Sequence, residues 1–186
     1  VAKNMAHVHM AHVTASWNDT PESKGLLTTA MSEAEIAVQH AGFAAAKMDN
    51  LKWIKAHIGH VAHAVDPAAA GGKGPGLGYG VLKAAKGVAA HIGFAAASDA
   101  ASKNVKGHAV HVSASAGNVV AWSGEILALA SQVKAATSAV QAAPLVTKIQ
   151  MLAGQLAAGV DANGDGKITW KKGEGGLGEA AKHMGF

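Results

Sequence analysis

The sequence has no cysteine and no arginine, and aromatic residues make up only 4% of it. Without cysteine, zinc fingers, thiolate copper sites, iron–sulfur clusters and CxxCH haem attachment are excluded. Recognition of phosphates and base edges relies on Arg forks and aromatic platforms. The net charge of +4 comes from scattered Lys residues, which we interpret as a solvated surface. No nucleic-acid partner is predicted.

Long apolar runs are also missing. None approaches the roughly 18 residues of a membrane span, so no membrane span is predicted. The chain begins with Val, and its start lacks the basic-then-apolar form of a signal peptide. A mature exported protein whose signal has been removed has this form, and so does a trimmed fragment. We predict a periplasmic or secreted protein.

What the sequence has in quantity is small residues and eleven histidines. Hydrophobic residues make up 49% of the chain, and many of them are Ala. Helices built from such residues bury little area each, so they must approach closely or enclose something. A structural cofactor would compensate for so lean a core. Assembly with a second copy or another protein would do the same.

The apolar spacing is helical over most of the chain. Asp66-Pro67 and Ser98-Asp99 are typical of helix breaks, and Gly117-Asn118 is predicted to kink or end a helix. Residues 68–78 are predicted to form a flexible connector. The predicted helices span residues 26–47, 50–65, 79–97, 102–116, 119–142 and 145–159. They divide the chain into a His/Met-rich arm (1–24), a His-rich bundle (25–142) and a carboxy-terminal segment (143–186).

An internal repeat organises the histidines. The segment HAGFAAAKMDNLKWIKAHIGH begins at His40, and HIGFAAASDAASKNVKGHAVH begins at His91. Aligned without a gap, the two share His, Gly, Phe, three Ala, two Lys and a final His-x-x-His. We interpret this as a duplication of a helical hairpin, with repeats at about 29–65 and 79–116.

The repeat predicts where the imidazoles converge. A spacing of three residues places two histidines on one helix face. In an antiparallel hairpin, the single His of the first helix then comes level with the pair on the second. We therefore predict two metal sites, formed by His40, His57 and His60, and by His91, His108 and His111. Possible additional ligands are His63 and, in the amino-terminal arm, Met5, His7, His9, Met10 and His12.

Two cofactor classes fit these histidines. Neutral imidazole suits transition-metal ions, and the Met/His cluster of the arm favours copper first and zinc second. The alternative is b-type haem held by two histidines from different hairpins, such as His40 and His91. No HExxH, Glu-x-x-His or Ser/His/Asp pattern is present. An open metal position could support catalysis, but nothing identifies a substrate, so an enzyme is not favoured.

The segment DANGDGKITWKK, residues 161–172, resembles the calcium loop of EF-hand proteins. The resemblance covers this loop alone and implies calcium ligation by its oxygen atoms. It departs from the EF-hand pattern at position twelve, where Lys172 replaces the bidentate Glu and Glu174 is the substitute. We expect weak, structural calcium binding. The implied ligands are Asp161, Asn163, Asp165, Lys167 (through its carbonyl), Thr169 and Glu174.

These observations predict an all-α fold: a four-helix bundle of two repeated hairpins, with an additional helix and the EF-hand-like loop. The predicted function is binding, storage or delivery of a transition metal in an exported compartment. A bis-His haem protein for electron transfer or sensing is the second hypothesis. The third is a structural or assembly protein whose histidines bind no metal.

Overall fold

The computed structural model describes residues 4–71 and 74–185. Over these residues the chain forms eight α-helices and a short 3-10 helix with no β-strand, so the predicted all-α class is confirmed. Residues 1–3 of the predicted arm, residues 72–73 of the predicted connector and residue 186 lie outside the described residues. The elements are α1 (Met5–Thr14), η1 (Pro21–Ser23), α2 (Leu26–Ala45), α3 (Leu51–Val65), α4 (Pro67–Ala70), α5 (Val81–Ala97), α6 (Lys103–Ala135), α7 (Ala139–Ala158) and α8 (Leu177–Met184).

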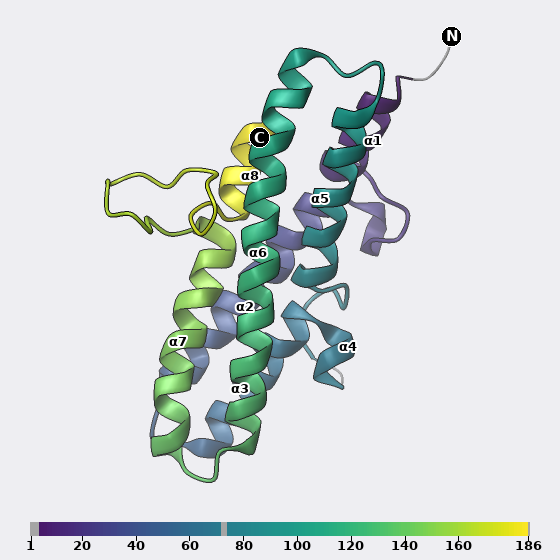
Figure 1. The fold of residues 1–186 in the computed structure, drawn as a ribbon. Coiled ribbons are helices and arrows are strands. Elements are labelled where there is room, and N and C mark those ends of the chain that lie inside the picture. Colours follow the sequence, from purple (N-terminus) through teal and green to yellow (C-terminus); the bar gives the residue numbers. More distant parts are fainter. Residues whose placement is uncertain (1–3, 72–73, 186) are drawn as a thin grey trace.

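The long helix α6 runs along the whole molecule (Figure 1). Its first half packs against α5 and α8, and its second half packs against α3 and α7. Helix α2 lies behind it and contacts α3, α5 and α7. The short α1 packs on α5 and α2, so the first and last helices both dock on the outside of longer ones. None of the described helices is long and apolar enough to cross a membrane.

The core is rich in Ala, as the composition predicts. Helix α2 buries one stripe of small side chains, formed by Ala30, Ala34, Ala37, Ala41 and Ala44. Each methyl contributes only about 0.8 kcal/mol when buried, against roughly 1.5–3 kcal/mol for a Leu or Ile side chain. The larger buried residues, such as Ile54, Ile92 and Ile126, are outnumbered by Ala. Because this core buries little apolar area per residue, any further link between helices would add substantially to the stability of the fold.

The predicted break at Gly117-Asn118 is wrong, because α6 continues through it. Asn118 is buried, and its amide nitrogen donates to the carbonyls of Lys171 (2.9 Å) and Gly175 (3.0 Å). Its amide oxygen accepts from the backbone N–H of Gly173 at 2.8 Å. With these partners the side chain does not compete with the helix backbone. It fastens the carboxy-terminal loop to α6 instead.

The next boundary is also corrected. The predicted run 119–142 belongs to two helices, which are separated at residues 136–138. Ser138 caps α7 by accepting a hydrogen bond from the N–H of Gln141 at 3.3 Å. Pro144 lies inside α7 rather than before it. It is exposed and near the start of the helix, where its missing N–H affects a solvated turn.

Much of the predicted flexible connector is held in place. Residues 67–70 form α4, and the side chain of Glu33 on α2 fixes the segment that follows residue 74. This carboxylate is fully buried, and it accepts hydrogen bonds of 2.8–3.1 Å from the backbone N–H groups of Leu77, Tyr79 and Gly80. Those donors offset the cost of burying a charge. Residues 74–78 of the connector are therefore held against α2 by Glu33.

Candidate metal centres

Nine of the eleven histidines lie in three clusters of three. In each cluster, one ring nitrogen from each imidazole lies within 4.8 Å of the other two. We name them the N-terminal triad (His9, His12, His91), the hairpin triad (His40, His57, His60) and the C-terminal triad (His108, His111, His183).

All three triads have the same construction. Two histidines spaced three residues apart on one helix meet a single histidine from another helix. The pairs lie on α1, α3 and α6, and the single His91, His40 and His183 lie on α5, α2 and α8. Because an α-helix has 3.6 residues per turn, each pair shares one face. One helix thus presents two imidazoles, and its neighbour completes the set.

In every triad the single histidine brings its Nδ1 atom close to the Nδ1 atoms of both pair members. The distances are 3.1 and 3.3 Å in the N-terminal triad, 2.9 and 3.2 Å in the hairpin triad, and 3.0 and 3.3 Å in the C-terminal triad. Imidazole nitrogens placed tetrahedrally at roughly 2.0–2.1 Å from a zinc ion are about 3.3 Å apart. The triads therefore have the spacing of ligands around one ion.

Hydrogen bonds between the imidazole rings explain these short Nδ1–Nδ1 distances less well than a shared metal ion does. An imidazole Nδ1 carries either one proton or one lone pair, so it can satisfy only one of two short contacts. The single histidine of each triad has two such contacts. A cation at the common centre satisfies all three nitrogens at once, with each proton on the outward Nε2 atom.

The surroundings favour neutral imidazoles. Partial burial and then the neighbouring imidazoles lower the pKa of the single histidines His40 and His91. The same causes, burial first, lower the pKa of His12, His57 and His111, and Lys47 adds to the effect at His57. A neutral imidazole keeps the lone pair that a metal ion requires. Acidification would protonate these rings and remove the lone pairs that a metal ion requires.

A tryptophan lies against each triad. The centroids of Trp17, Trp53 and Trp170 lie 4.5, 4.3 and 4.3 Å from the rings of His91, His57 and His111. Phe94 and Phe43 flank the N-terminal and hairpin triads. These rings exclude water from one side of each triad and restrict the motion of the imidazoles. No role was predicted for the tryptophans, although Trp53 lies one helical turn before His57.

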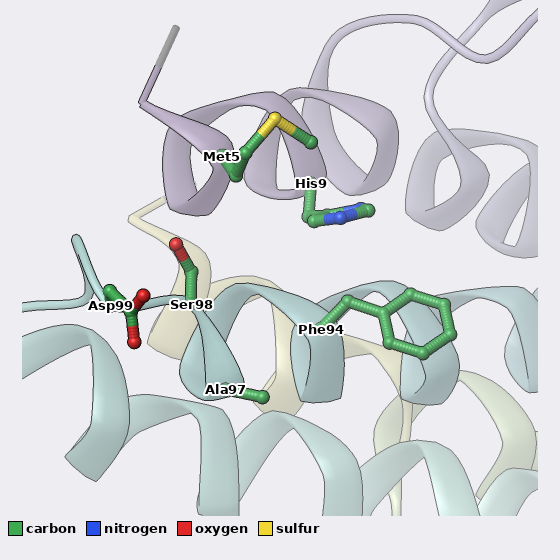
Figure 2. Close-up of a pocket in the computed structure, with 6 residues that line it drawn as sticks. All are labelled: Met5, His9, Phe94, Ala97, Ser98 and Asp99. Carbon is green, nitrogen blue, oxygen red and sulfur yellow. The ribbon is translucent and has the colours of Figure 1, made fainter. Parts of the chain in front are cut away.

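The N-terminal triad opens on a cavity of about 590 Å³ between α1 and the end of α5. Figure 2 shows Met5 and His9 of α1 facing Phe94 and Ser98 across this cavity. The other lining residues are Ala97 and Asp99. An ion or a small ligand therefore has an open approach to His9.

The C-terminal triad has a carboxylate behind its single histidine. Glu179 Oε1 lies 3.3 Å from His183 Nε2, one helical turn away on α8, and the carboxylate is largely buried. Its other oxygen accepts from Lys182 Nζ at 2.9 Å. A carboxylate bonded to the outer nitrogen of a histidine fixes the ring and directs the Nδ1 lone pair at the ion.

Glu179→Gln is expected to weaken metal binding at the C-terminal triad by roughly tenfold or more, because the neutral amide orients and polarises His183 less well. The other two triads should keep their affinity, since Glu179 contacts neither. Competition with a chromophoric chelator measures the three affinities. Glu35→Gln is a matched control, because Glu35 is exposed on α2. Equal weakening at all three triads would contradict this role for Glu179.

Of the two predicted sets of three histidines, the structure brings one together as predicted. The structure clusters His40, His57 and His60 as the hairpin geometry predicts. The second predicted set is corrected: His91 joins His9 and His12, while His108 and His111 join His183. His183 and its partner Glu179 were missed. Their four-residue spacing on the amphipathic segment 177–184 was the available signal.

The remaining predicted ligands lie outside the triads. His63 is buried, and its Nδ1 donates to the carbonyl of Pro75 at 3.1 Å, so it helps to hold the connector. His7 is exposed on α1. Met10 packs against the core, whereas Met5 is 46% exposed and lines the cavity at His9.

The EF-hand-like loop folds around its own side chains. Asp161 accepts from the N–H groups of Gly164, Asp165 and Gly166 at 2.8–3.1 Å. Asn163 and Asp165 each accept from the backbone N–H two residues ahead, which belong to Asp165 and Lys167. The buried Glu174 accepts from the Asn163 amide (2.7 Å) and the Thr169 hydroxyl (2.6 Å). Glu174 therefore turns into the loop although it lies two residues beyond position twelve.

Comparisons of this chain with known protein families, with curated proteins and with solved structures found no match. The three triads are therefore the features of this chain that indicate a function. Their geometry is compatible with metal binding.

Proposed function

We propose that this protein binds three transition-metal ions, one in each triad, and that it stores or delivers them in a periplasmic or extracellular compartment. Copper is the first candidate and zinc the second. The proposal is carried by one observation: the same convergence of three Nδ1 atoms occurs three times, on three different pairs of helices. A chance contact between histidines has no reason to repeat with the same atoms and the same spacing.

The chemistry of the triads supports storage and exchange. Three imidazoles leave a fourth position open on a tetrahedral ion, where an incoming ligand can bind before the ion leaves. Partly exposed rings keep that position accessible. Imidazole suits both copper and zinc, and no thiolate is present to select between them.

The geometry favours single ions over haem. The haem hypothesis pairs His40 with His91, and these lie in different triads. Within each triad the Nδ1 atoms lie 2.9–3.3 Å apart, whereas trans ligands of one iron stand about 4 Å apart, twice a metal–nitrogen bond of about 2 Å. The assembly hypothesis, in which the histidines bind no metal, does not explain why three triads have the same geometry.

The test is metal uptake by protein that was purified without a histidine-affinity step and stripped with a chelator. Dialysis against zinc or copper, followed by elemental analysis, should give three ions per chain. Copper(II) should also quench Trp17, Trp53 and Trp170 but affect the core residue Trp122 less. Retention of less than one ion at micromolar free metal would reject the proposal. A Soret band in the purified protein would support haem instead.

The proposal extends to how the fold arose. We infer that the hairpins α2–α3 and α5–α6 descend from one duplicated unit and form the four-helix part of the bundle. The 51-residue offset between His40 and His91 supports this, as does the recurrence of His-x-x-His on α3 and α6. Association with a second copy or another protein remains part of the proposal, since the Ala-rich core is lean.

We also propose that the loop at 161–174 binds calcium weakly and serves a structural role. The inward position of Glu174 supports this, because that carboxylate is the substitute for the missing Glu at position twelve. Calorimetry should show a dissociation constant on the order of 10⁻⁴–10⁻³ M. Asp161→Asn should abolish the heat of binding, and Asp99→Asn outside the loop should leave it unchanged. No uptake at millimolar calcium would reject the site.

A further inference from the structure

The N-terminal triad differs from the other two at one register position. Counting four residues back from the first histidine of each pair gives Met5 before His9, Trp53 before His57 and Asn104 before His108. At the hairpin triad this residue contacts the first histidine, since Trp53 lies 4.3 Å from His57 between ring centroids. The position therefore reaches the triad, and only in the N-terminal triad does it carry a sulfur atom.

The side chain of Met5 is not needed for packing. It is 46% exposed, and it lines the cavity that opens on His9. Figure 2 shows its thioether on the same side of the cavity as the His9 ring. Met10, the other methionine of α1, packs against the core instead. A long flexible side chain that shares a cavity with His9 and is not buried has freedom to move onto a bound ion.

We propose that the N-terminal triad is a copper(I) site in which Met5 supplies a thioether as the fourth ligand beside the imidazoles of His9, His12 and His91. This rests on the proposed function and deepens it by assigning one triad a particular ion. Thioether sulfur is a soft ligand that selects copper(I) and contributes little to zinc. The hairpin and C-terminal triads, which have imidazole ligands alone, do not discriminate in this way.

A thioether ligand beside an open cavity suits the N-terminal triad to the exchange of copper(I) with other molecules. Its open cavity allows a donor or acceptor with soft ligands to reach the ion while Met5 swings aside. Exchange of ligands then proceeds without leaving the copper uncoordinated. The triad with Met5 is the site of copper(I) entry and exit.

The test compares copper(I) and zinc in wild-type protein and Met5→Leu, with the metals as probes and a competing chelator under anaerobic conditions. Met5→Leu should weaken copper(I) binding at one of three sites by on the order of tenfold and leave zinc unchanged. X-ray absorption should show a sulfur neighbour of copper in the wild type, and this should be lost in the variant. Met31→Leu is the control, because Met31 is another partly exposed methionine, on α2.

Asn104→Met tests the role of methionine by adding a ligand to one triad instead of removing a ligand from another. It places a methionine at the matching position of the C-terminal triad, where copper(I) affinity should rise. Copper(I) bound by nitrogen alone, with Met5→Leu without effect, would overturn the role of Met5 and leave the metal-binding proposal intact. Failure of the wild type to hold copper or zinc at all would instead reject the proposed function itself.

Discussion

His40→Ala should reduce the metal content from three ions to two, with the loss confined to the hairpin triad. His40 makes both short Nδ1 contacts of that triad, so its removal leaves two ligands on one helix. Structural zinc sites with four ligands provide roughly 10–16 kcal/mol, which is about 3 kcal/mol for each ligand and about a hundredfold in affinity. His91→Ala and His183→Ala should act in the same way on the other triads. Elemental analysis after dialysis at low free metal measures the stoichiometry.

The triads share no residue, so these losses should add. Combining His40→Ala with His183→Ala should leave one ion, and the three substitutions together should leave none. His7→Ala is the matched control, because His7 is exposed on α1 and lies outside every triad. If His7→Ala removes an ion, or if His40→Ala keeps all three, the hairpin triad is not a binding unit.

The sequence predicts the hairpin triad because its geometry is local. His40 and the pair at His57 and His60 flank one turn, and the number of residues on each side of that turn sets their level along the helices. No other described helix brings a histidine to this place. Helix periodicity and the length of the connection are then sufficient to find the site.

The same reasoning gives the wrong partner for His91. The hairpin α5–α6 brings His91 level with His108 and His111, but level along the axis does not fix the direction in which a side chain points. That direction depends on which helices dock on the outer faces, and these are α1 on α5 and α8 on α6. Both are short, and both are distant in sequence from the residues they meet. Sequence periodicity can show that a short helix is amphipathic, but it does not specify which long helix that short helix docks on.

The histidine that completes the C-terminal triad illustrates this limit. His183 lies after a loop that brings Trp170 onto His111, and buried Asn118 fastens that loop to α6. Asn118 was the residue at which the sequence predicted a break in the helix. A polar residue within a helical run is consistent with a break or with a distant partner, and only the tertiary structure distinguishes the two.

Metal binding should stabilise the protein most at its two terminal helices. Helix α1 has ten residues and α8 has eight, which is too short for stability in isolation. Each helix buries few apolar side chains, and most of these are small. They are Ala6 and Val13 in α1, and Leu177, Ala180 and Ala181 in α8. An ion in the N-terminal triad ties α1 to α5, and an ion in the C-terminal triad ties α8 to α6. Metal-free protein should therefore open at both ends while the hairpin stays folded.

The free metal concentration and the dissociation constant of each site set the size of the effect. The single histidine lies 79 and 82 residues from its partners in the N-terminal triad, but only 17 and 20 in the hairpin triad. An ion in the N-terminal triad therefore joins segments that are distant in the chain, whereas an ion in the hairpin triad joins two neighbouring helices. Free metal at a hundred times the dissociation constant adds about 2.7 kcal/mol for each site. The thermal midpoint should rise clearly on addition of zinc.

Hydrogen exchange measured by mass spectrometry, with and without zinc, locates this stabilisation. Peptides from α1 and α8 should gain the most protection, and peptides from α3 should gain less, because α2 and α3 already pack closely without an ion. In His183→Ala the gain at α8 should disappear while the gain at α1 remains, because the two ions act on different helices. Equal protection of all helices in both proteins would mean that zinc binds elsewhere, since only ions in the terminal triads can hold these two helices against the bundle.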